Sequence, residues 1–244
     1  SVSLDEVVFD TFRGGHIPLS RAADEVVETL RDAIKPIYEP WYDGVEGGGW
    51  LDGDDIVIGY AAESGAFAYP VKILNLHEIV NDFIDGVPVL VSYCPLCASA
   101  VVYDRTLDGQ VLLFGNTSAL YESDMVMYGH ETGSYWFQVP GEAIVGPLTG
   151  KRLTMLPSMT TTWDDWKRLH PDTSVLSRNL GLLSGRSAYN RDPFASYDQS
   201  VNRGRFAFPV SEDRLDARLR PGDRGIALQV GESHRAYELL DEDW

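Results

Sequence analysis

The sequence predicts a β-rich α+β fold: antiparallel sheets in a barrel-like body built from hairpins, with a few short helices and an N-terminal helix. Two observations support this. From Asp55 onward, short apolar runs are separated by turn residues, a pattern typical of hairpins. Helical spacing of apolar residues is confined to a few short segments. The 244 residues suit one large domain or two small ones. We expect a helical appendage over residues 1–50 and a main β-rich domain over residues 51–244.

The N-terminal helix is predicted over Ser20 to Ile34, "SRAADEVVETLRDAI", because its apolar residues fall on one face. Ser20 is a suitable N-cap and Pro36 a stop. The next stretch, "KPIYEPWYDGVEGGGW", contains the three glycines Gly47 to Gly49 and is predicted to be the loop that separates the appendage from the body.

The body begins with "DIVIGYAAESGAFAYPVKIL", which predicts a strand, a turn and a second strand. A further hairpin is expected at Asp108-Gly109, another around Gly133 in "DMVMYGHETGSYWFQ", and short strands in "GEAIVGPLTGKRLTMLP". Helices are predicted from Ile73 to Ile84 and in "TTWDDWKRLHP", where Thr161 or Thr162 is the expected cap. The segments starting at Ile58 and Ile226 align without a gap, so we expect two equivalent hairpins, each followed by a helical turn.

The composition excludes some partners. A net charge of −17 repels phosphate backbones, so nucleic acid is not expected to bind. The same charge fits adaptation to high salt or an ordinary acidic protein, and these two explanations stay open. No apolar run is long enough to span a membrane. Because numbering begins at Ser1, we expect an extracytoplasmic protein whose leader has been removed, or otherwise a cytoplasmic one.

Both cysteines of the chain lie in "YCPLCAS", as Cys94 and Cys97. This spacing suits a metal held by two thiolates and also suits a disulfide-forming pair. With no further cysteines, a metal site would need His, carboxylate or solvent as its other ligands. The following "ASAVVYDR" reads as a strand, so the pair lacks the helix N-terminus that activates thioredoxin-type thiols.

His77 is the expected third ligand, because it belongs to a polar cluster just ahead of the thiols, on the predicted helix that also carries Asn81 one turn later. His130 is the reserve ligand. Along the strands that follow, Asp124, Tyr128 or Gln138 could line one face of a pocket. Aromatic and sulfur side chains there, Tyr135, Trp136, Met125 and Met127, are expected mainly to pack in the core, although methionine can also bind copper.

Several runs of this chain closely resemble the family known as domain of unknown function 3179. They include "AYPVKILNLHEIVNDFIDGVPVLVSYCPLCASAVVYDR", "FGNTSALYESDMVMYGHETGSYWFQVPGEAIVGPLTGKRLTMLPS" and "YNRDPFASY", in the family's order from about residue 55 to 240. The resemblance implies that the 93–97 segment, His77-Glu78, Asp124, Trp136 and Gln138 belong to the family pattern. This chain departs from that pattern at Ala98, where members typically have Gly, and at Gly129-His130, where an Asp-Arg pair is common.

Three hypotheses follow. The first is a copper or zinc site with Cys94, Cys97 and His77 as ligands and Cys94, Cys97 and Asp124 as candidate catalytic residues of a redox enzyme. The second is a metal-free thiol-disulfide oxidoreductase that uses the same cysteines. The third is a non-catalytic, β-rich binding module. The expected partner is a small molecule or a redox protein.

Overall fold

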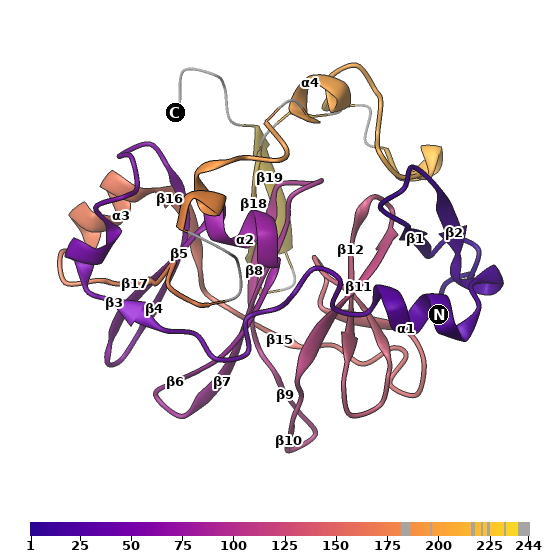
Figure 1. Ribbon diagram of the computed structural model, residues 1–244, viewed down its shortest axis with the longest axis horizontal. Coiled ribbons are helices and arrows are strands. Elements are labelled where there is room, and N and C mark those ends of the chain that lie inside the picture. Colours follow the sequence, from indigo (N-terminus) through magenta and orange to yellow (C-terminus); the bar gives the residue numbers. More distant parts are fainter. Residues whose placement is uncertain are drawn as a thin grey trace.

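The computed structural model describes residues 1–181, 186–195, 197–215, 218–220, 222–223, 225–231 and 233–238. Antiparallel sheets and short helices make up these ranges (Figure 1), which confirms the β-rich α+β prediction. None of the sheets within these ranges closes into a barrel, so the expected barrel-like body consists of open sheets. No helix of the described ranges is long and apolar enough to cross a membrane.

Two sheets form the centre and one side of the molecule (Figure 1). The four-stranded sheet has the order β15 (Thr154–Leu156), β8 (Ser99–Asp104), β7 (Val87–Cys94) and β6 (Ile79–Ile84). The five-stranded sheet has the order β16 (Met159–Thr162), β4 (Ile56–Ala62), β5 (Gly65–Pro70), β17 (Ser174–Leu176) and β3 (Tyr42–Asp43). Strand β17 joins β5 in parallel, and the other pairings of these two sheets are antiparallel.

The opposite side holds a six-stranded antiparallel sheet and most of the N-terminal segment. Its order is β14 (Glu142–Val145), β13 (Tyr135–Phe137), β12 (Asp124–Gly129), β11 (Phe114–Tyr121), β1 (Val8–Asp10) and β2 (His16–Pro18). Two hairpins stand apart from these sheets, β9 (Thr106–Leu107) with β10 (Gln110–Val111) and β18 (Gly225–Val230) with β19 (Ser233–Glu238).

The helices are short. The α-helices are α1 (Asp24–Leu30), α2 (Val71–His77), α3 (Trp163–Leu169) and α4 (Tyr197–Val201), and the 3-10 turns are η1 (Leu19–Arg21), η2 (Val45–Gly48), η3 (Arg186–Asn190) and η4 (Glu212–Arg214). The predicted cap of α3 is confirmed, because Thr162 accepts a hydrogen bond from the Asp165 amide at 3.2 Å. Helix α1 is shorter than predicted: Ser20 lies in η1 and its hydroxyl binds Asp5 instead of capping the helix.

The helix predicted from Ile73 to Ile84 is wrong in its second half. Helix α2 ends at His77, Glu78 takes a left-handed φ of 58°, and β6 begins at Ile79. The residues from Ile79 to Asp82 are all buried, so both faces of this part of the strand are covered. Its sequence therefore lacks the apolar-polar alternation by which a half-exposed strand is told from a helix. His77 and Asn81 are therefore not neighbours on one helix face, because the backbone changes from helix to strand at Glu78.

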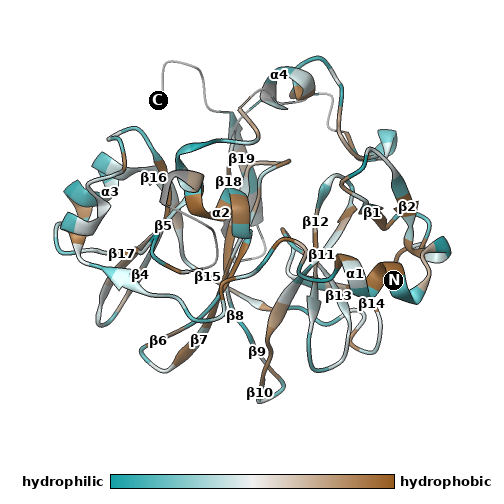
Figure 2. Cartoon of the chain, in the orientation of Figure 1, coloured by the Kyte–Doolittle hydropathy of each residue, from teal (hydrophilic) through white to brown (hydrophobic). Residues whose placement is uncertain are grey.

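Asn81 joins the four-stranded sheet to the six-stranded sheet. Its side-chain nitrogen donates to the Phe114 carbonyl at 2.8 Å, and its side-chain oxygen accepts from the Phe114 amide at 2.9 Å. One amide side chain therefore replaces a missing backbone partner at the start of β11. Apolar residues concentrate on the central strands β7 and β8 (Figure 2), whose side chains belong to two buried clusters on the two faces of the sheet.

The first fifty residues hydrogen-bond to strands of the body. Strand β1 pairs with β11, β3 pairs with β17, and Ile37 bridges to Val80. The boundary at residue 50 stays a prediction, and these contacts show that the N-terminal segment is packed into the sheets.

The two hairpins that align in sequence share one register. Ile58 pairs with Tyr69 in β4–β5, and Ile226 pairs with Tyr237 in β18–β19, so equivalent positions of the two segments face each other in both hairpins. Helix α2 follows the first hairpin. The helical turn expected after the second falls at residues 239–244, outside the described residues.

Candidate functional site

The two cysteines lie at the end of the β7–β8 hairpin. Cys94 is the last residue of β7 and pairs with Ser99, the first residue of β8, and Cys97 lies in the connecting turn. Ala98 completes this turn with a φ of 49°, in the left-handed region that favours glycine. The strand predicted after the thiols is thus confirmed, and no helix begins at the pair. The Cys94 side chain is buried and Cys97 is exposed.

A carboxylate from another sheet completes the group. Asp124 is the first residue of β12 and is 5% exposed. Cys97 Sγ lies 3.1 Å from Asp124 Oδ1, and the ligand atoms of Cys94, Cys97 and Asp124 all lie within 4.8 Å of one another. The thiols come from the four-stranded sheet and the carboxylate from the six-stranded sheet. The site therefore exists only where the ends of these sheets meet.

Hydrogen bonds fix the surroundings of the exposed thiol. Cys97 Sγ is 2.9 Å from Ser99 Oγ, which donates to Gln138 Oε1 at 2.9 Å. Gln138 is fully buried, and its Nε2 donates to Ser92 Oγ at 3.0 Å. The Val139 amide donates to Asp124 Oδ2 at 3.1 Å. Asp124 and Gln138 thus both belong to the hydrogen-bonded surroundings of Cys97, and their role there stays a prediction.

The family model described as "Protein of unknown function (DUF3179)" matches residues 31–241 of this chain. The chain belongs to the DUF3179 family. No curated protein and no solved structure matched it. Membership in DUF3179 brings no assigned activity, so the chemistry of the site must be argued from its residues.

The left-handed turn gives a physical reason for the glycine expected in other DUF3179 members at position 98. A Cβ at this position makes the left-handed conformation cost roughly 1–2 kcal/mol. This chain keeps the conformation with Ala98, which indicates that the turn geometry between the thiols and β8 is retained despite that cost.

Because Cys94 and Asp124 are buried, a negative charge on either side chain is unfavourable unless another group compensates it. Burial raises the pKa of the Cys94 thiol well above its usual value, and Cys97, Asp124 and Glu78 raise it further. Burial also raises the pKa of Asp124, although hydrogen bonds from Cys97 and from backbone amides act in the opposite direction. A bound cation would reverse this balance, because it stabilises thiolate and carboxylate together.

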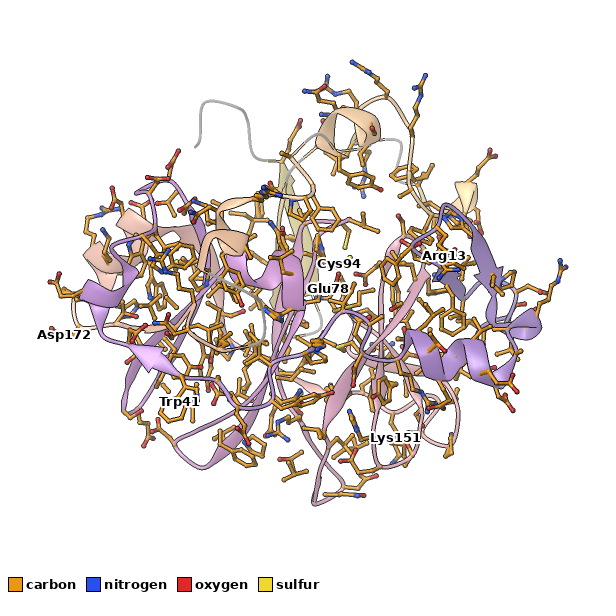
Figure 3. All side chains as sticks on the ribbon, viewed as in Figure 1. Arg13, Trp41, Glu78, Cys94, Lys151 and Asp172 are labelled. Atoms are coloured by element: carbon orange, nitrogen blue, oxygen red, sulfur yellow. The ribbon has the colours of Figure 1, made fainter. Side chains whose placement is uncertain are left out.

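A second buried carboxyl lies beside the group. Glu78, the residue between α2 and β6, is 8% exposed, and Figure 3 shows it close to Cys94 at the middle of the molecule. Burial raises its pKa to about 8, with a further contribution from the negative charge of Asp124. Asn116 donates to Glu78 Oε2 at 2.5 Å and also lies 3.6 Å from Met125 Sδ. At neutral pH Glu78 is therefore mostly protonated.

His77 lies outside this group of ligand atoms. Its Nδ1 is 2.7 Å from the Lys35 carbonyl, and its Nε2 is 2.9 Å from the Tyr189 hydroxyl. A carbonyl only accepts, so Nδ1 carries the hydrogen and Nε2 of the neutral ring accepts from Tyr189. Burial lowers the pKa of His77, which favours this neutral form. Both nitrogens are engaged, so the structure does not bring the expected imidazole to the thiols.

The other candidate residues make contacts of a different kind. His130 is exposed, stacks on Tyr128 and lies 3.0 Å from the Tyr38 hydroxyl. Tyr128 donates to Asp32 instead of lining the site. Trp136 and Tyr135 are buried, as expected for core residues, and Met125 and Met127 are buried as well.

Sequence reasoning gave no role at the site to two residues, Glu78 and Asn116, although the family resemblance includes Glu78. For Glu78 the signal was present, since it follows His77 in a polar cluster, but the helix prediction directed attention to His77. Asn116 gave no such signal. It lies next to an irregularity in the β11–β12 pairing, where Ser118 takes a φ of 59°, and its amide contacts Glu78 from there.

Proposed function

We propose that this chain binds a copper or zinc ion through Cys94, Cys97 and Asp124. The observation that carries the proposal is the convergence of two sulfur atoms and one carboxylate oxygen within 4.8 Å, on elements from two sheets. Ligand atoms around a tetrahedral Zn²⁺ with thiolate bonds of about 2.3 Å are about 3.8 Å apart. A small closure of the group would therefore suffice.

The donor set supports a soft or borderline metal. Thiolates select copper(I) and zinc over magnesium or calcium. Three protein ligands leave one position open, as in catalytic zinc sites, and the exposed side of Cys97 is where solvent or substrate would reach it. Ser99 and Gln138 supply the outer hydrogen bonds that hold such ligands in place.

Metal content of the purified protein tests the proposal. Protein prepared without chelator, and protein reloaded with Zn²⁺ or copper(I), should contain close to one metal per chain by elemental analysis. The Cys94→Ala, Cys97→Ala double variant should lose that metal. Asp124→Asn should weaken binding by more than the roughly 10- to 100-fold typical of losing an outer-shell partner.

Two further variants act as controls. Asp108→Asn removes an exposed carboxylate that pairs with Lys151, and it should leave the metal content unchanged. His77→Gln tests whether Asp124 or His77 is the third ligand, since the two possible ligand sets share Cys94 and Cys97. If Asp124 is the ligand, the variant should keep its metal. Equal metal in wild type and the double-cysteine variant would refute the proposal, and loss of metal in His77→Gln alone would return the imidazole to the ligand set.

A second candidate function is thiol-disulfide exchange without a metal. It is favoured by the closeness of the two free thiols and by the exposure of Cys97, where an attacking disulfide could arrive. In metal-free protein treated with diamide, the two S–H bonds break, a Cys94–Cys97 disulfide forms, and two protons and two electrons pass to diamide, which is reduced to its hydrazine. Intact-mass analysis detects this loss of two hydrogens, and a chain that keeps both thiols would contradict the redox function.

A further inference from the structure

A cavity of about 380 Å³ opens beside the thiol site, at the C-terminal end of α2. Its lining comes from three segments that are distant in sequence: Ala33, Ile34, Lys35, Asn75, Leu76, His77, Glu78, Pro193 and Phe194. The volume lies in the range of small-molecule sites, and the lining combines apolar side chains with a few polar ones, as such sites do. Glu78 belongs to the lining of this cavity, and its carboxyl is close enough to Cys94 to raise the pKa of that thiol when the carboxyl is ionised.

Asn75 carries a buried acceptor without a partner. The residue is 8% exposed, and its Oδ1 has no hydrogen-bond partner among the described residues. An unpaired buried acceptor costs about 1–3 kcal/mol. The Nδ2 of the same amide donates to exposed Asp192 Oδ1 at 3.2 Å, which is a long hydrogen bond. Asn75 belongs to the lining of the cavity, so a ligand that brings a hydrogen-bond donor into it would supply the partner that Oδ1 lacks.

The described lining of the cavity offers no buried cation. The His77 ring is neutral, because its Nδ1 donates to the Lys35 carbonyl and its Nε2 accepts from the Tyr189 hydroxyl. Lys35 is exposed, so its side chain extends into solvent. An anionic ligand would lose hydration here without gaining an opposite charge. An uncharged ligand with a donor would instead satisfy Asn75 Oδ1.

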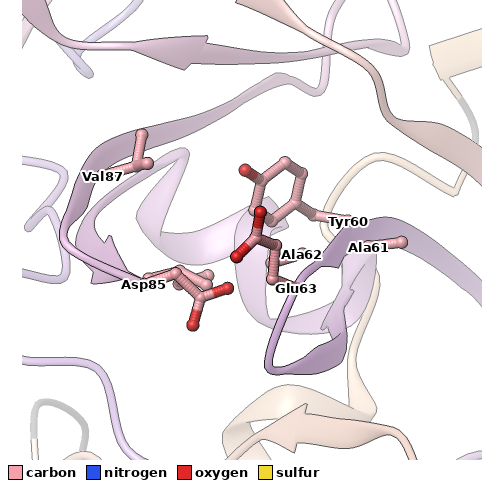
Figure 4. A pocket seen from close by; sticks show the side chains of 7 residues that line it. Tyr60, Ala61, Ala62, Glu63, Asp85 and Val87 are labelled. Atoms are coloured by element: carbon pink, nitrogen blue, oxygen red, sulfur yellow. The ribbon is translucent and has the colours of Figure 1, made fainter.

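A second cavity, of about 490 Å³, lacks the features that mark the cavity at α2. It lies between the β4–β5 and β6–β7 turns, and Glu63 and Asp85 lie at its surface (Figure 4). Asp85 already accepts from the Ser64 amide at 2.9 Å. This second cavity has neither an unpaired buried group nor a link to the thiols, which singles out the one at α2.

We propose that the cavity at the C-terminal end of α2 is a binding site for a small uncharged amide that also carries an apolar group. Its N–H would donate to Asn75 Oδ1, and its apolar part would pack on Leu76 and Phe194. The ligand would then lie next to the thiol group, separated from it by Glu78. Occupancy of the cavity does not require a metal.

Benzamide is a suitable probe because it has both an amide and an apolar ring. Titration followed by amide resonances of ¹⁵N-labelled protein should shift the signals of Asn75 and its neighbours, with a dissociation constant in the millimolar range expected of a fragment. N,N-dimethylbenzamide, which lacks the N–H, and benzoate, which is charged, should each bind at least about tenfold more weakly, because the loss of one buried hydrogen bond has that effect.

Asn75→Leu keeps the side-chain volume and removes the acceptor, and it should weaken benzamide binding at least about tenfold. Asn179→Leu, at an exposed position, is the matched control and should bind as wild type does. The Cys94→Ala, Cys97→Ala variant should also retain benzamide, so that loss of the metal site and loss of the cavity site are distinguishable. Equal affinity of wild type and Asn75→Leu, equal binding of dimethylbenzamide, or no shift up to the solubility limit would each overturn the proposal.

Discussion

Replacing Glu78 by Gln should remove much of the pH dependence of stability in the metal-free protein. Glutamine retains an oxygen that can accept from Asn116, as Glu78 Oε2 does. It lacks the ionisation that burial opposes, since the pKa of Glu78 rises from 4.5 to about 8 on folding. The variant therefore changes the charge of this position while it keeps the volume and the hydrogen bond.

The sign follows from proton binding. Between pH 4.5 and about 8 the unfolded chain has released the Glu78 proton while the native protein still holds it. The native state thus binds more protons, and wild-type stability falls as pH rises through this window. The full difference is on the order of 3 to 5 kcal/mol above pH 8. Glu78→Gln should match wild type near pH 4.5 and exceed it by several kcal/mol at pH 9.

Urea unfolding in the presence of chelator, measured from pH 4.5 to 9, gives this difference directly. Subtracting the two curves isolates Glu78, because His77, Asp124 and Cys94 titrate in both proteins. Glu39→Gln, at an exposed position, is the control and should follow the wild-type curve. If the wild-type and Glu78→Gln curves run parallel across the window, Glu78 is ionised in the native protein and the reasoning fails.

Three further perturbations test the fold around the site. Asn81→Ala should lower the free energy of unfolding by about 2–5 kcal/mol, because it leaves the amide and carbonyl of Phe114 without partners. Urea unfolding measures this loss. A loss below about 0.5 kcal/mol, which is usual for surface substitutions, would contradict the bridging role of Asn81. Ala98→Gly should raise stability by up to about 1 kcal/mol by relieving the left-handed turn, and a measured loss would argue against that conformation. Raising KCl to molar concentration should increase the melting temperature, since salt screens repulsion within a chain of net charge −17, and a temperature independent of salt would show that this repulsion does not limit stability.

The sequence determined the elements whose signal is local. The hairpin at Asp108-Gly109 formed as predicted because both residues tolerate the positive φ that a tight turn requires. The cap of α3 at Thr162 and the strand after Cys97 are equally local features. The motif that holds both cysteines, and its separation from any helix N-terminus, could therefore be read before the structure was known.

The tertiary structure decided which residues meet the thiols. The expected partner His77 is only two residues from β6, the strand that pairs with β7, yet it still belongs to α2 and its ring nitrogens contact Lys35 and Tyr189. Asp124 takes the place beside Cys97 because two sheets meet at their ends. Periodicity describes how a segment faces its own neighbours, whereas the packing of one sheet against another depends on the whole chain. The sequence could therefore name Asp124 as a candidate, but only the tertiary structure places its carboxylate beside Cys97.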